Sequence, residues 1–133
     1  MSDIVAKLAE LRDQERALRA MSVRTSAAEL GRAIYPGFQS CFYFDVIASS
    51  FNSCWQDVRG KKRGISRTCV GIPFQHGKTL LTELFVAQAL GIDPSLQIIS
   101  ACYNTTFARE RISGVQRLMN TEFYKATFPT RFG

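Results

Sequence analysis

The sequence is poor in the residues that build metal centres and disulfide frameworks. It has one histidine, His76, and four cysteines, none of which forms a CxxC pair. Zinc sites are built from clusters of cysteine and histidine, so this composition predicts no metal-ligand set of that kind. The cysteines are widely spaced, which is typical of reduced thiols in a reducing compartment: Cys41, Cys54, Cys69 and Cys102.

Long apolar runs and a targeting pattern are also lacking. The longest uncharged apolar stretches, such as residues 96–103, fall far short of the ~20 residues that a membrane-spanning helix needs. Residues 1–20 alternate acidic and basic side chains, which is not the pattern of a secretory signal peptide. We therefore expect a cytoplasmic protein that has no membrane partner.

Positive charge is in excess. Seventeen lysines and arginines stand against eleven acidic residues, which gives a net charge of +6. Such a balance favours an acidic partner, either nucleotide or nucleic acid. The basic run Lys61, Lys62 and Arg63 can be interpreted as a solvated connector or as a contact to a phosphate backbone. On the second interpretation we expect weak, sequence-independent binding of double-stranded DNA.

Residues 1–60 predict a helical arm. The first helix, over residues 2–20, has an apolar stripe that Glu15 interrupts: Ile4, Leu8, Leu11 and Leu18. A second helix is expected to begin at Ser26, where Ser-Ala-Ala-Glu has capping-box spacing, and to end at Pro36. A third is expected over residues 41–58, with aromatic side chains that we interpret as packing rather than as a binding stripe: Phe42, Tyr43, Phe44, Phe51 and Trp55.

Residues 61–133 have a different character. Buried strands are expected at residues 65–72 and 96–103, and helices at 78–90, 105–119 and 121–127. Gly91 is expected to end the helix that joins the two strands. Two strands joined by one helix make a right-handed parallel crossover. The sequence therefore predicts an α/β fold with parallel strands in its second part.

The segment between the first expected strand and the helix that follows it has the residues of a phosphate-binding site. It reads GIPFQHGKT over residues 71–79, at the place where a phosphate-binding loop is expected. Gly77 lets the backbone approach phosphate oxygens, and the amides at the helix N-terminus converge on the anion. Lys78 would reach the β- and γ-phosphates of ATP, and the Thr79 hydroxyl would ligate Mg²⁺. The predicted nucleotide-binding residues are Gln75, His76, Gly77, Lys78 and Thr79, with ATP and Mg²⁺ as cofactors.

The loop departs from the usual GxxxxGK[ST] pattern. The position five residues before Gly77 holds Ile72, and Gly71 comes one step too early. We interpret the loop as a deviant form opened by Pro73. His76 lies inside it, and we assign it a conformational or phosphate-side role rather than that of a general base.

These residues resemble the large terminase subunit of tailed phages, the ATPase motor that packages DNA into proheads. Residues 73–79 (PFQHGKT) are similar to loops such as PPRHGKS in that family, and residues 96–119 to its second strand and following helix. Residues 33–38 and 44–48 look like its pre-core segment, which lies near the adenine. The resemblance implies an incomplete P-loop core of RecA type behind the helical arm. It also implies the small terminase subunit and the portal as partners, in the bacterial host cytoplasm.

The family's Walker B strand and nuclease carboxylates have no counterpart after Thr79. Glu83 and Glu110 are expected on helices rather than at a strand end, so neither receives a catalytic role. We therefore expect an N-terminal part of a phage or prophage terminase large subunit, without ATP hydrolysis that depends on Lys78. Two alternatives stay open: another P-loop NTPase, helicase-like or a kinase, and a non-catalytic interaction module whose N-terminal helices bind a partner.

Overall fold

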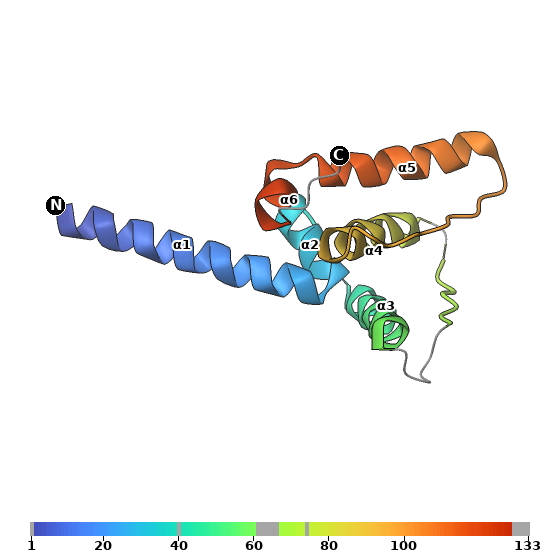
Figure 1. Cartoon of the computed structure of the whole chain (residues 1–133), viewed down its shortest axis with the longest axis horizontal. Coiled ribbons are helices and arrows are strands. Elements are labelled where there is room, and N and C mark those ends of the chain that lie inside the picture. Colours follow the sequence, from blue (N-terminus) through green and yellow to red (C-terminus); the bar gives the residue numbers. More distant parts are fainter. Residues whose placement is uncertain (1, 40, 61–66, 74, 129–133) are drawn as a thin grey trace.

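The chain forms helices joined by irregular segments. A computed structural model describes residues 2–39, 41–60, 67–73 and 75–128. Within this part the helices are α1 (Ser2–Thr25), α2 (Ala27–Ile34), α3 (Phe42–Gly60), α4 (Lys78–Ile92), α5 (Thr105–Met119) and α6 (Glu122–Thr127). No strand occurs among the described residues (Figure 1).

The predicted α/β fold is therefore wrong for the described residues, and so is the RecA-type core of parallel strands. Residues 67–72 and 96–103 adopt no regular secondary structure, and residues 65 and 66 lie outside the described part. Parallel strands are stable when helices cover both of their faces. Here the helices bury their apolar sides against one another, while Ile99 and Tyr103 are 94% and 83% exposed. Within the described part of the chain, residues 96–103 thus have no partner strand and no helix that covers Ile99 and Tyr103.

The predicted helices agree better with the structure. The helix expected over residues 105–119 has the bounds of α5. Ser26 caps α2, as the sequence predicts, because its hydroxyl accepts a hydrogen bond from the backbone N–H of Ala28 at 3.3 Å. The carboxylate of Glu29 pairs with Arg32.

One predicted helix end is wrong. Gly91 lies inside α4 and is buried, and the C-cap is Asp93. A Cβ atom on Gly91 would lie 2.6 Å from Cγ of Phe128 and 2.8 Å from the hydroxyl of Tyr124. The glycine is therefore explained by the close approach of these aromatic rings to the α4 backbone, and not by a helix end.

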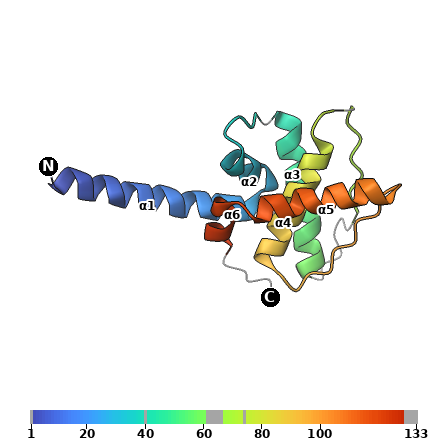
Figure 2. The ribbon, with the colours of Figure 1, turned by 90° about the horizontal axis from the view of Figure 1, so that it is seen from above.

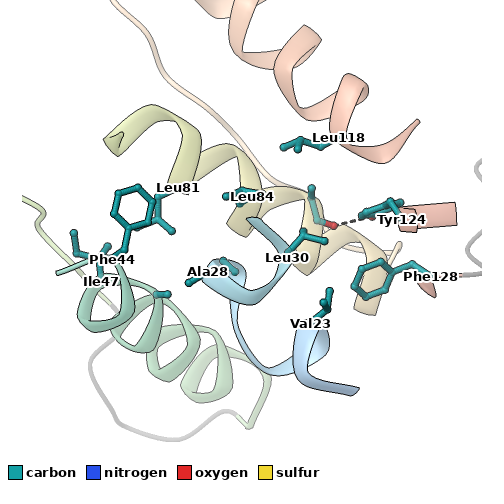
Figure 3. Close-up of a cluster of buried hydrophobic side chains, with 13 residues drawn as sticks. Val23, Ala28, Leu30, Phe44, Ile47, Leu81, Leu84, Leu118, Tyr124 and Phe128 are labelled. Carbon is teal, nitrogen blue, oxygen red and sulfur yellow. Dashed lines mark hydrogen bonds between the residues drawn. The ribbon is translucent and has the colours of Figure 1, made fainter. Parts of the chain in front are cut away.

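One hydrophobic cluster joins helices from both halves of the chain (Figure 3). Leu30 of α2, Leu84 of α4 and Leu118 of α5 are each at most 1% exposed. Tyr124 of α6 closes the cluster, and its hydroxyl donates a hydrogen bond to the carbonyl oxygen of Ala87 at 2.7 Å. Burial raises the pKa of Tyr124 to about 12, because a buried phenolate would lose its hydration.

Among the described residues of α1, those at its C-terminal end join this body. Val23 is 1% exposed, and its carbonyl oxygen accepts a hydrogen bond from the side-chain amide of Gln88 at 2.9 Å. Arg24 donates to the carbonyl oxygen of Thr127 at 3.1 Å. Residues 3–19 are exposed, and α1 projects away from the other helices (Figures 1 and 2). Neither α1 nor another helix of the described residues has the length and apolar character needed to cross a membrane.

Candidate functional site

The predicted phosphate-binding loop leads into the N-terminus of α4. Gln75 and Gly77 have positive φ angles of 62° and 75°, so the backbone turns sharply before α4 begins at Lys78. Gly77 occupies the N-cap position in the left-handed conformation, which glycine adopts without a steric penalty. The backbone of this turn therefore depends on a glycine at position 77. Residue 74 lies outside the described part.

A second constraint on Gly77 comes from the start of α3. A Cβ atom at Gly77 would lie 2.6 Å from Cζ of Phe44, a buried side chain that is 6% exposed. The ring of Tyr43 lies 6.2 Å from the ring of His76, and Phe38 packs edge-on against Phe44 with ring centroids 5.4 Å apart. These aromatic rings together support the loop from one side.

The prediction that the aromatic side chains of residues 41–58 serve packing is only partly correct. Their assignment to packing is confirmed for Phe44 and Trp55, which are buried, and is wrong for Phe42, which is 82% exposed. Helical periodicity could not show that Phe44 lies against Gly77, because the two residues are far apart in the chain. The related expectation from the sequence was that the family resemblance implies a position of residues 44–48 near the adenine, which is not a contact with Gly77.

The first turn of α4 has backbone N–H groups that point out of the helix end. Among the described residues no side chain caps this end, and the N–H of Leu81 is the first to bond within the turn, to the carbonyl oxygen of Gly77 at 3.0 Å. The N–H groups of Lys78, Thr79 and Leu80 therefore have no acceptor inside the helix. Together with the helix dipole they favour an anion at this position.

Lys78 folds back over the loop. Its ammonium group donates hydrogen bonds to the carbonyl oxygens of Ile72 and Pro73, the second at 3.3 Å. The charge is thus held beside the loop backbone, although the residue as a whole is exposed. A phosphate oxygen that replaced these neutral acceptors would form a stronger, charge-assisted hydrogen bond.

The metal expected with ATP has one candidate ligand in the loop. Thr79 lies in the first turn of α4 and is half-buried. The described residues contain no group of three or more histidines, cysteines and acidic residues that could hold a metal ion. Magnesium in such sites is bound through one or two carboxylates and the phosphates of the substrate, and P-loop proteins add a loop hydroxyl. The Thr79 hydroxyl would supply one ligand of a Mg²⁺ ion held by nucleotide phosphates, and no carboxylate ligand is assigned among the described residues.

Glu83 and Glu110 lie on helices, as the sequence predicts, and each interacts with an arginine. The Glu83 carboxylate accepts a hydrogen bond from Arg111 at 2.7 Å, and its side chain is 12% exposed. Gly114 makes room for it, because a Cβ atom there would lie 2.5 Å from that carboxylate. Glu110 lies 3.7 Å from Arg111. The partly buried pair of Glu83 and Arg111 joins α4 to α5.

Glu83 is expected to make stability depend on pH. Burial raises the pKa of Glu83 above its ordinary value of 4.5, and the charges of Arg111 and Arg117 oppose this only in part. The folded protein then holds this proton more tightly than the unfolded chain does. The contribution of Glu83 to the free energy of unfolding therefore falls as the pH rises from 4.5 through the raised pKa.

Urea denaturation over a pH series, from about 7 to about 4, checks this linkage. The free energy of unfolding of the natural protein, relative to that of Glu83→Gln, is expected to increase as the pH falls. The substitution Gln116→Ala, at an exposed and uncharged position of α5, is the control, because it removes no titrating group. A relative stability of Glu83→Gln that stays constant over the series would contradict the expectation.

Comparison with known proteins finds no family model that matches the chain. It also finds no significant match among curated proteins or solved structures. The functional interpretation therefore depends on the geometry and chemistry of the loop, together with the sequence resemblance.

Proposed function

We propose that residues 75–79 bind the phosphates of ATP·Mg²⁺, and that the chain is an ATP-binding part of a DNA-packaging terminase large subunit. The observation that carries nucleotide binding is the position of the Lys78 ammonium group beside the loop that leads into the uncapped start of α4. Free backbone N–H groups next to a fixed cation are what polyphosphate binding requires. This requirement involves one loop and one helix end, so it does not depend on paired strands.

Each loop residue has a separate task in this proposal. Backbone N–H groups of Gly77, Lys78 and Thr79 would donate to phosphate oxygens, while the Lys78 ammonium group exchanges its carbonyl partners for the β- and γ-phosphates. The Thr79 hydroxyl would complete the coordination of Mg²⁺. Hydrolysis of ATP also needs a residue that orients the attacking water, and none is assigned here because Glu83 is paired with Arg111.

The packaging role and its DNA partner are supported by weaker observations. Residues 73–79 and 96–119 resemble the terminase family, as described above. The basic run at Lys61, Lys62 and Arg63 lies outside the described residues. A shallow hollow of about 530 Å³ on α5 is lined by three guanidinium groups, two hydroxyls and one carboxylate: Arg109, Arg111, Arg117, Thr106, Ser113 and Glu110. Arg109 and Arg117, with the two hydroxyls, suit phosphate contacts that are independent of base sequence. Arg111 is paired with Glu83, and the Glu110 carboxylate would repel phosphate.

Replacing Lys78 by alanine tests the proposed function. The variant loses a charge-assisted contact, so the affinity for ATP·Mg²⁺ is expected to fall by about 1.5–3 kcal/mol, or roughly 10- to 150-fold. Isothermal titration calorimetry measures this change. Inorganic triphosphate is expected to displace ATP, because the contacts are made to phosphate rather than to the base.

Lys125→Ala is the matched control, since it removes an exposed lysine from α6 without touching the loop. Its affinity for ATP·Mg²⁺ is expected to equal that of the natural protein. Circular dichroism establishes that both variants keep their helices. Equal nucleotide affinity for the natural protein and Lys78→Ala would refute the assignment of the loop.

A further inference from the structure

The exposed part of α1 has an apolar stripe that the other described residues leave uncovered. Four large side chains of residues 3–19 are 65%, 50%, 51% and 67% exposed: Ile4, Leu8, Leu11 and Leu18. Helices of this length gain most of their stability from packing an amphipathic face. Because α1 projects from the other helices (Figure 1), an uncovered stripe along it is accessible to a docking partner.

The spacing of this stripe is that of a coiled-coil seam. Ile4, Leu11 and Leu18 recur every seven residues, and Leu8 and Glu15 each follow four residues after a member of that series. Alternating steps of four and three residues place side chains along one line, where those of a second helix can insert between them. The stripe therefore fits a helix better than it fits an extended segment.

The charges on both sides of the seam have one sign. Among the positions that flank it, Lys7, Arg12 and Arg19 are the charged ones. The other flanking positions are uncharged: Val5, Gln14 and Met21. The acidic residues outside the seam lie on the opposite side of the helix: Asp3, Glu10 and Asp13. Charges beside the seam determine partner specificity in coiled coils, because they form ion pairs between the helices. These cations therefore favour a partner helix with acidic residues beside its seam.

The ion pairs within α1 leave these cations available. Lys7 lies 3.1 Å from Glu10, and Arg19 lies 2.7 Å from Glu15. The side chains in both pairs are more than half exposed. Exposed pairs of this kind contribute little to stability, so a partner carboxylate can replace them at small cost.

A second copy of the chain does not meet these requirements. In either orientation its flanking residues would bring cations and neutral side chains together, with no ion pair between the helices. In a parallel pair Glu15 would also face its own copy inside the seam, where two desolvated carboxylates repel. A membrane surface fits less well, because Glu15 interrupts the apolar face and residues 2–25 contain no aromatic residue.

We propose that α1 docks with an amphipathic helix of another protein, one whose apolar seam is flanked by aspartate and glutamate. The partner seam has a lysine or asparagine opposite Glu15. A polar group at one such position sets the register of the two helices at a small cost in stability. This interaction is independent of nucleotide binding at residues 75–79.

Two synthetic peptides test the proposal against the full chain. Both have a leucine seam with one central lysine, and their flanking positions hold glutamate in one peptide and lysine in the other. Fluorescence anisotropy is expected to show roughly 10-fold tighter binding of the acidic peptide at low salt, and a smaller preference at high salt. Leu11→Asp is expected to abolish binding of both peptides.

Two charge variants distinguish the effect of the charges beside the seam from that of the overall charge of α1. Replacing Lys7, Arg12 and Arg19 by glutamate is expected to reverse the peptide preference, provided that circular dichroism shows α1 intact. The double variant Glu10→Lys/Asp13→Lys, on the opposite side of the helix, is expected to keep the original preference.

Three results would overturn the proposal. The first is equal affinity for the two peptides, or binding that Leu11→Asp leaves unchanged. The second is a dimer of the chain in sedimentation that Leu11→Asp dissociates, which would make a second copy the occupant. The third is tighter binding to vesicles of phosphatidylserine and phosphatidylcholine than to the acidic peptide, lost in Leu11→Asp, which would assign the stripe to a membrane surface.

Discussion

Replacing Gly77 by alanine is expected to destabilise the folded protein by about 2–5 kcal/mol and to abolish nucleotide binding by the loop. The residue has a φ of 75°, and a side chain in this left-handed conformation costs about 1–2 kcal/mol. The new methyl group would also lie 2.6 Å from Cζ of Phe44, which is buried and cannot withdraw into solvent. Overpacking of this kind adds about 1–3 kcal/mol.

Urea denaturation of Gly77→Ala and calorimetry with ATP·Mg²⁺ measure the two effects. Gly37→Ala is the matched control, because a Cβ atom at Gly37 would meet nothing within 4 Å. It is expected to change the free energy of unfolding by at most about 0.5 kcal/mol. A Gly77→Ala protein as stable as Gly37→Ala would show that the loop does not have the described backbone.

A double-mutant cycle separates the two costs. Phe44→Leu shortens the side chain that a methyl group at position 77 would meet, but it leaves the backbone strain in place. Gly77→Ala is therefore expected to cost less in the Phe44→Leu background than in the natural protein. The cost that remains measures the left-handed backbone, which only glycine adopts freely.

Truncating Leu84 to alanine is expected to lower the free energy of unfolding by about 2–5 kcal/mol. Leu84 is fully buried in the cluster that joins α2, α4 and α5, so its removal loses transfer free energy and leaves a cavity. Since small domains have about 5–15 kcal/mol in total, the variant is expected to be partly unfolded at physiological temperature. Leu8→Ala on α1 is the control, because Leu8 is 50% exposed.

Gly31 gives a sharper test of this packing. A Cβ atom at Gly31 would lie 2.9 Å from Cδ1 of Leu84 and 3.0 Å from Cζ of Phe38. Gly31→Ala alone is therefore expected to destabilise the protein. In the Leu84→Ala background the same methyl group enters the vacated space, so the double variant is expected to be more stable than the sum of the single effects predicts. Strict additivity in denaturation measurements would mean that the two residues are not in contact.

The sequence alone determined the features that depend on near neighbours in the chain. The cap at Ser26 and the extent of α5 follow from side chains within a turn or two of each other. Residues 75–79 were predicted from the sequence to form a phosphate-binding loop, because Gly77, Lys78 and Thr79 place a glycine, a lysine and a hydroxyl in consecutive positions. Their role in binding stays a prediction.

The tertiary structure decided the features that depend on residues far apart in the chain. An apolar run such as 96–103 has the composition of a buried strand, but a strand exists only when a second one pairs with it. Glycine is common at helix ends, but Gly91 lies inside α4. The rings of Tyr124 and Phe128 pack onto it there. Phe44 lies against Gly77 because α3 and α4 pack together. A local pattern predicts which conformation a segment can adopt, whereas burial by distant residues determines which one it keeps.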